Sequence, residues 1–285
     1  MALKPTHAPR RFTATKTFTD REGPKATFIA AYRRTQAAGE YRVLHWYGVG
    51  GQGKSALSRE FLRMGAEARH SQDNARRAAA RINLQDPRLR QIGEALLAIR
   101  LQLGAVFGHR FSAFDTAFAR YFVSTNPGVD IRAKHPELFR GENGLLNDLL
   151  DWSEAGVEVM AAGASFAVPG LNLLYKYGAR MGARAQEWFA ARGKTVLQGL
   201  DQFSSDELLE RLPTYLGADL CYLLEKEPDA RATIILDTHE ELWRDQMTSD
   251  QVEGERADRW VRRLVQDSPG CLFVLMGRDR LRWQE

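Results

Sequence analysis

The chain has 285 residues, 44% of them hydrophobic, which is enough to bury a core in one large domain or two small ones. The 40 Lys and Arg residues against 36 Asp and Glu residues leave a net charge of +4, and the basic clusters are short and mixed with acids. This pattern favours solvated helix faces over a nucleic-acid-binding surface. The two cysteines lack metal-ligand spacing and are typical of buried thiols in a reducing compartment, so we expect a cytoplasmic protein.

The first predicted elements are a tail and a strand. Residues 1–15 contain Pro and Arg but no apolar core, which argues against a signal peptide and predicts a flexible tail. Residues 42–47 form an apolar run rich in β-branched and aromatic side chains, which predicts a buried strand.

The strand leads into residues 48–55, which match the pattern GxxxxGK[ST] of a phosphate-binding loop. Glycines let successive backbone N–H groups turn inward around a phosphate. Lys54 is expected to reach the β- and γ-phosphates, and the Ser55 hydroxyl to bind Mg²⁺. Apolar residues at Leu57 and Phe61, and further along the same face, predict a helix whose positive end points at the phosphates. The residues expected to line the nucleotide site are Gly48, Gly50, Gly51, Gln52, Gly53, Lys54, Ser55 and Ala56.

A second strand is predicted at 79–84, followed by two helices. Asp86 can cap a helix and Pro87 can start one, and an apolar stripe at helical spacing continues from Leu89 to Leu103. Another helix is predicted over 113–123.

Residues 141–200 are harder to assign. The segment Val159–Tyr175 carries no charged residue, but it is short and interrupted by Gly163, Pro169 and Gly170. These features favour a buried helical hairpin that turns at 168–170 over a membrane-spanning helix.

The last third of the chain again shows clear elements. Ser204 and Glu207 form a capping box that opens a helix, which we expect Pro213 to break or restart. Apolar strands are predicted at 232–237 and 271–276, with a helix through 260–265 between them. These strands do not alternate between polar and apolar residues, which predicts a parallel sheet covered by helices on both faces.

Polar residues at or just after the ends of two strands are candidates for the second half of a nucleotide site. Asp237 ends an apolar strand and is expected to hold Mg²⁺. Glu240 is our first choice for the group that activates water, and Glu241 is the alternative, whereas His239 is interpreted as structural or solvent-facing. Arg278 follows the last strand, where its guanidinium would stabilise transferred charge on a γ-phosphate.

Together these motifs resemble the STAND signal-transduction ATPases, which are relatives of the AAA-type ATPases. The resemblance rests on the GxGGxGK[ST] form of 48–55, the acidic strand 234–240 and the strand ending in Met276-Gly277-Arg278. More narrowly, the chain is similar to bacterial members whose ATPase module precedes a helical repeat sensor. The segment Phe18-Thr19-Asp20-Arg21-Glu22 is similar to the hydrophobic-x-Gly-Arg-Glu element that this family places near the adenine.

The resemblance implies an ATP·Mg²⁺ site and a role for each matching residue. Lys54 and Ser55 would bind phosphate and Mg²⁺, and Asp237 would bind Mg²⁺. Arg278 would sense the γ-phosphate, and Arg21 would lie near the base or ribose. The family further implies self-association in the ATP state, a role in bacterial regulation or antiviral defence, and a C-terminal sensor region that is not in this chain.

Two departures from the family pattern bear on activity and organisation. Thr238 stands where many relatives have a second acid, which leaves open whether ATP is hydrolysed efficiently. The long separation between Ser55 and Asp237 implies a large helical insertion at about 90–205.

The sequence therefore predicts a three-layer α/β/α P-loop ATPase domain over 16–285 that acts as a nucleotide-controlled switch with slow hydrolysis. Two alternatives stay open at this point. One is an ATPase that moves on or loads onto DNA, and the other is a module that binds nucleotide without hydrolysing it. We expect neither nucleic acid nor a membrane as a partner.

Overall fold

The computed structural model describes residues 21–35, 42–67, 75–108, 111–139, 187, 189–200, 202–244, 257–281 and 283. Its longer elements are α1 (Glu22–Arg34), β1 (Arg42–Tyr47), α2 (Lys54–Glu67), β2 (Arg77–Asn83), α3 (Ile92–Phe107), α4 (Ser112–Thr125), α10 (Ser205–Lys226), β3 (Arg231–Asp237), α12 (Arg259–Asp267) and β4 (Leu272–Gly277). Short helical segments are η1 (Pro87–Arg90), α5 (Ile131–Lys134), η2 (Pro136–Leu138), η4 (Phe189–Gly193), α9 (Lys194–Val196) and η5 (His239–Leu242).

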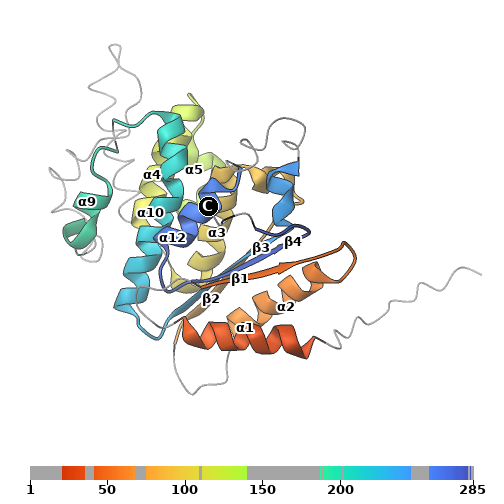
Figure 1. The fold of residues 1–285 in the computed structure, drawn as a ribbon. Coiled ribbons are helices and arrows are strands. Elements are labelled where there is room, and N and C mark those ends of the chain that lie inside the picture. The colour runs from red at the N-terminus through yellow and green to blue at the C-terminus, as the bar shows by residue number, and fades with distance from the viewer. Residues whose placement is uncertain are drawn as a thin grey trace, which may run out of the picture.

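The four strands form one parallel sheet in the order β1-β4-β3-β2 (Figure 1). Strand β4 therefore lies between β1 and β3, although it comes last in the sequence. The carboxyl end of β4 pairs with the carboxyl ends of β1 and β3, since Gly277 is opposite Tyr47 and Met276 is opposite Asp237. The carboxyl ends of these three strands consequently meet at one edge of the sheet.

Helices cover both faces of the sheet, an arrangement compatible with a three-layer α/β/α fold (Figure 1). On one face, Phe28 of α1 and Leu57 and Phe61 of α2 pack against alternate residues of β3 and β4. On the other face, α3, α10 and α12 pack together over the remaining residues of the strands, and α4 packs on α10. Alternate side chains of β3 and β4 thus enter different cores, which explains why both strands are apolar throughout.

A buried carboxylate joins α4 to α10. The N-cap residue of α4, Phe111, forms no capping hydrogen bond through its own side chain. Asp219 of α10 instead accepts hydrogen bonds from the backbone N–H groups of Ala113 (3.2 Å) and Phe114 (2.8 Å). Burial raises the pKa of Asp219 well above its usual value. A buried ion pair of Arg100 and Asp115, 2.6 Å between Nη2 and Oδ2, links α3 to α4 beside it. These contacts satisfy polar groups that would otherwise destabilise the helical layer.

Most predicted elements are confirmed within one to three residues. The strand predicted at 79–84 is observed as β2, and Asp86 caps η1 through the backbone N–H of Arg88 with Pro87 in the first turn. The capping box at Ser204 and Glu207 opens α10 as predicted. The helices predicted to end at 123 and to run through 260–265 are observed as α4 and α12.

Three predictions about these elements were wrong. Pro213 does not interrupt α10, which continues through it, because the proline is buried in the packing of the helical layer. Strand β1 is only half-buried, since it lies at an edge of the described sheet and pairs on one side with β4. Cys271 is buried as expected, but Cys221 is only partly so.

Several predictions lie wholly or partly outside the described residues. The tail 1–15, the hairpin predicted at 168–170 and the segment Val159–Tyr175 belong to this group. Among the helices that the structure describes, none has the length and hydropathy needed to cross a membrane. The limits of the predicted insertion, 90–205, stay a prediction, although its helices α3 and α4 share one core with α10 and the sheet.

Gly217 of α10 packs closely against the end of α12. A Cβ added at Gly217 of α10 would lie 2.5 Å from the backbone oxygen of Asp267, at the end of α12. Gly217→Ala should therefore lower the free energy of unfolding by about 2 kcal/mol, because backbone atoms must move apart. Urea denaturation would measure this change. Gly23→Ala in α1 is the control, since a Cβ there meets no atom of the described residues within 4 Å. An equal effect of both substitutions would contradict the packing.

Candidate functional site

The glycine-rich loop Gly48–Ser55 joins β1 to α2 at the carboxyl edge of the sheet. Gly51 and Gly53 adopt φ values of 83° and 79°, a left-handed conformation that strains residues with a side chain. No atom of the described residues lies within 4 Å of a Cβ at Gly51, so conformation and not crowding requires glycine there. Glycine is therefore the residue that this backbone conformation favours at both positions.

Lys54 is the first residue of α2, and its side chain folds back over the loop. The Nζ atom donates hydrogen bonds to the backbone oxygens of Gly48 (2.5 Å) and Val49 (2.9 Å). The ammonium group is thus held next to the loop backbone and the N-terminus of α2, where anions are stabilised.

Arg21 lies beside the same loop. It directly precedes α1, and its guanidinium donates a hydrogen bond to the backbone oxygen of Gln52. The Nη2 atom is also 3.7 Å from the position of a Cβ at Gly53. Arg21 therefore approaches the loop, and its role near a base or ribose stays a prediction.

Asp237 is buried at the end of β3, on the face covered by α2. Its Oδ2 atom lies 2.6 Å from Nη2 of Arg81 in β2 and 3.0 Å from Oγ of Ser58 in α2. The Ser58 hydroxyl is also 2.9 Å from the backbone oxygen of Ser55, so Ser58 links Asp237 to the end of the loop.

Sequence reasoning missed both Arg81 and Ser58. Arg81 carried a usable signal, because it is a charged residue in the middle of the apolar run Ala78-Ala79-Ala80-Arg81-Ile82. Ser58 follows Ser55 by one helical turn, which places it on the same side of α2.

Thr238 is the only described residue other than glycine with a positive φ. Its φ of 62° and ψ of 47° are unusual for a β-branched side chain. This conformation turns the chain from β3 directly into η5, and the hydroxyl lies 3.4 Å from Oδ1 of Asn83. Strained backbone of this kind is concentrated at functional sites, so the strain points to this edge of the sheet.

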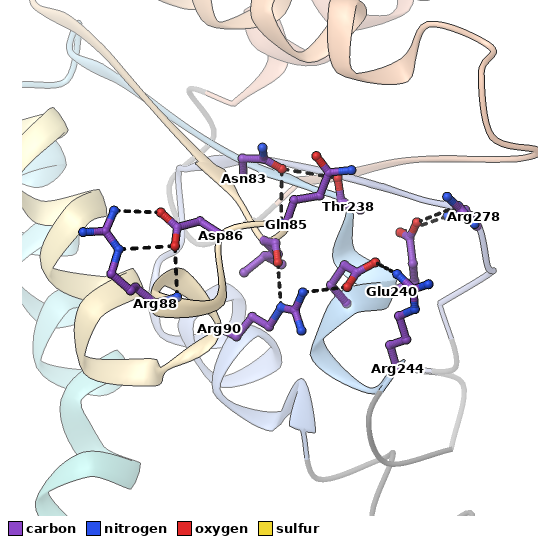
Figure 2. A network of polar contacts seen from close by, with 11 residues as sticks. Asn83, Gln85, Asp86, Arg88, Arg90, Thr238, Glu240, Arg244 and Arg278 are labelled. Atoms are coloured by element: carbon purple, nitrogen blue, oxygen red, sulfur yellow. Dashed lines mark hydrogen bonds and ion pairs between the residues drawn. The ribbon is translucent and has the colours of Figure 1, made fainter. Parts of the chain in front are cut away.

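The turn at Thr238 brings Glu240 to the end of β4. The Glu240 carboxylate accepts a hydrogen bond from the backbone N–H of Arg278 (3.1 Å) and forms an ion pair with its Nε atom (3.3 Å; Figure 2). The Arg278 guanidinium also lies 3.7 Å from the position of a Cβ at Gly50. The structure therefore brings Glu240, Arg278 and the glycine-rich loop together.

Glu241 takes part in different contacts. Its carboxylate binds Arg90, which follows β2, at 2.8 Å and Arg244 at 2.8 Å. Arg90 in turn donates to the backbone oxygen of Leu84 (Figure 2). Glu241 thus links η5 to the segment after β2, whereas Glu240 contacts Arg278, which lies beside the loop.

His239 is buried on the other side of η5. Its ring contacts Trp243 edge-on with centroids 4.7 Å apart, and its Nε2 atom has no hydrogen-bond partner among the described residues. Desolvation, with smaller effects of the charges on His45 and Arg262, lowers the pKa of His239 to about 3. The imidazole is therefore neutral, which agrees with a structural role.

The binding of a metal ion by Ser55 and Asp237 stays a prediction. No group of three or more His, Cys, Asp or Glu side chains in the described part of the chain could form a metal cage. Mg²⁺ commonly binds one or two protein oxygens and fills its remaining positions with water and phosphate oxygens. Ser55 and Asp237 are of the right type for such a site.

Comparisons with known proteins add no further evidence. No protein-family model, curated protein or solved structure matches this chain. The molecule is thus defined as an α/β protein with a parallel sheet and a glycine-rich loop at its carboxyl edge. Its resemblance to STAND ATPases stays a prediction.

The conformation of Thr238 predicts an unusual order of stability. Thr238→Gly should be more stable than Thr238→Ala by about 1 kcal/mol, because only glycine adopts left-handed backbone without a steric cost. Both substitutions remove the hydroxyl, so their difference isolates the backbone. Chemical denaturation of the two variants would measure it, and a more stable alanine variant would contradict the assigned conformation.

Burial of His239 predicts a pH dependence of stability. Its pKa is about 3 in the folded chain and close to 6.5 when unfolded, so the unfolded chain binds more protons between these values. Stability should therefore fall as the pH drops from 6.5 towards 3, by at most about 1.4 kcal/mol per pH unit from this group. Denaturation at several pH values should show a shallower fall for His239→Phe, and an unchanged slope would refute a buried neutral imidazole.

Proposed function

We propose that this chain binds ATP together with Mg²⁺ and works as a nucleotide-controlled switch. The observation that supports the proposal most strongly is the meeting of three strand ends. Strand β1 leads into the loop Gly48–Ser55, β3 ends at Asp237 and β4 leads into Arg278. Ligands of open parallel sheets bind at this carboxyl edge.

In this proposal, each part of the site acts on the phosphates. The loop amides and the N-terminus of α2 stabilise negative charge. Lys54 exchanges its contacts with the loop oxygens for phosphate oxygens. Ser55 and Asp237 provide oxygen ligands for Mg²⁺, which when bound neutralises phosphate charge.

The pair of Glu240 and Arg278 gives the switch its second state. A γ-phosphate beside Gly50 offers Arg278 a second anionic partner. Glu240, when released from Arg278, becomes available to accept a proton from an attacking water. Because the pair would differ between the nucleotide-free and ATP-bound chain, ATP would favour one state over the other.

A binding module without turnover is a second candidate. It is favoured by the contacts of Glu240, which is held by both the backbone and the side chain of Arg278, and by the absence of an acid at Thr238. Release of phosphate from ATP by the purified chain distinguishes the two candidates. Sustained release supports the switch with hydrolysis, and bound ATP without release supports the module.

The signalling role is the broader part of the proposal. Self-association in the ATP state, a sensor region outside this chain and a place in bacterial regulation or defence are proposed from the resemblance to STAND ATPases alone. A cytoplasmic location is proposed on the same basis and on the sparse cysteines.

Removal of the Lys54 ammonium tests the phosphate site. Lys54→Ala should weaken the binding of Mg·ATP by about 2 kcal/mol, or about thirtyfold, through loss of a charged hydrogen-bond donor. Isothermal titration calorimetry would measure the affinity. Lys134→Ala, at an exposed position of α5, is the matched control and should bind like the unmodified chain. Equal affinity of both variants would show that the site lies elsewhere.

A further inference from the structure

The carboxylate expected to bind Mg²⁺ already has a cationic partner within the chain. Nη2 of Arg81 lies 2.6 Å from Oδ2 of Asp237, and Nε of Arg81 donates to Oγ of Ser58 at 2.7 Å. The Ser58 hydroxyl is itself 3.0 Å from the same Oδ2. Side chains from β2, α2 and β3 thus form a closed triangle around one carboxylate oxygen.

The ion pair of Arg81 and Asp237 is largely buried, so it bears on the stability of the Asp237 carboxylate. The Arg81 side chain is 16% exposed and that of Asp237 is 2% exposed. A carboxylate buried to this extent is strongly destabilising unless a cation or several hydrogen-bond donors compensate for its lost hydration. Arg81 and Ser58 provide this compensation.

Arg81 and a divalent cation would require the same carboxylate. Mg²⁺ prefers oxygen ligands such as a carboxylate, directly or through its bound water. Two cations at one buried oxygen also repel each other more strongly than they would in water. We propose that Arg81 is an internal counter-cation that competes with Mg²⁺ for Asp237, so that metal-nucleotide binding and the Arg81–Asp237 pair oppose each other. This inference rests on the proposed function.

The backbone around Arg81 permits such a change without rearrangement of the sheet. The N–H of Arg81 donates to Oε1 of Gln102 in α3 at 2.9 Å, and Nε2 of Gln102 donates to the Arg81 oxygen at 3.3 Å. The main chain is thus held to α3, and β2 is an outer strand of the described sheet. Rotation of the partly exposed Arg81 side chain is enough to release Asp237.

Because of this competition, nucleotide binding would change contacts between β2, β3 and α2 that lie away from the phosphates. With the pair formed, Arg81 connects β2 to β3 and, through Ser58, to α2. With the pair broken, this connection is lost while the strand pairing remains. Such a two-state contact is the element that a nucleotide-controlled switch requires.

The test compares ATP affinity with excess Mg²⁺ and with EDTA. Arg81→Gln removes the charge and keeps a polar side chain. By isothermal titration calorimetry, the ratio of the two affinities should rise about tenfold or more over that of the unmodified chain, because Mg²⁺ no longer meets a competing cation. Arg81→Lys retains the charge and should raise the ratio much less. Arg77→Gln, in the same strand but distant from Asp237 in register, is the matched control and should leave the ratio unchanged.

The outcomes separate this inference from the proposed function. If the unmodified chain binds no ATP in either condition, the proposed function is wrong. If the unmodified chain binds ATP but Arg81→Gln leaves the ratio unchanged, the inference is overturned. In that case Arg81 only positions Asp237, whether ATP affinity stays the same in both conditions or falls by the same factor in both. Should Arg81→Gln not fold, as judged by circular dichroism, the Nε–H signal of Arg81 in the unmodified chain is measured by NMR with ATP in excess Mg²⁺ and with ATP in EDTA. The signal should shift between the two conditions, and an identical signal in both would overturn the inference.

Discussion

Strand β4 is hydrogen-bonded on both sides, to β1 and to β3, and the candidate site depends on this pairing. It sets the loop Gly48–Ser55, Arg278 and Asp237 at neighbouring positions of one sheet edge, although they are far apart in the sequence. Because β3 and β4 are buried on both faces, their apolar side chains hold the edge rigid from the two cores. Such a rigid edge positions polar side chains more precisely than a flexible loop would.

Charge compensation within the chain is the second property of this edge. Asp237 is paired with Arg81, Glu240 with Arg278 and Glu241 with both Arg90 and Arg244. Each of these three carboxylates is therefore engaged by at least one arginine. A ligand must exchange these contacts, and this exchange is the physical basis of the proposed switch. Figure 2 shows how closely the pairs around Glu240 and Arg90 are grouped.

Much of the fold could be predicted from the sequence because its signals are local. The apolar runs of β3 and β4, the cap at Asp86 and the capping box at Ser204 each depend on a few adjacent residues. Pro213 was misjudged because its burial in the helical layer outweighs the local tendency of proline to end a helix. The half-exposure of β1 could not be predicted, since it depends on which strands lie beside it.

The candidate site was predictable in part for the same reason. The glycine-rich loop is a local pattern, and the strand ends indicated Asp237 and Arg278. The pairing of Asp237 with Arg81 could not be read from the sequence, because it requires the order of the strands and the position of α2. The left-handed backbone of Thr238 is also a tertiary effect, since nothing in a threonine favours it.

We propose above all that the edge formed by β1, β4 and β3 binds ATP with Mg²⁺, which a crystal structure of the chain with a non-hydrolysable ATP analogue and Mg²⁺ would test. We expect the β-phosphate within hydrogen-bonding distance of the backbone N–H groups of Gly51 and Gly53, the metal ion near Ser55 and Asp237, and the Arg81–Asp237 pair broken. A nucleotide bound away from this loop, or an analogue that does not bind, would show that the edge is not the ATP site.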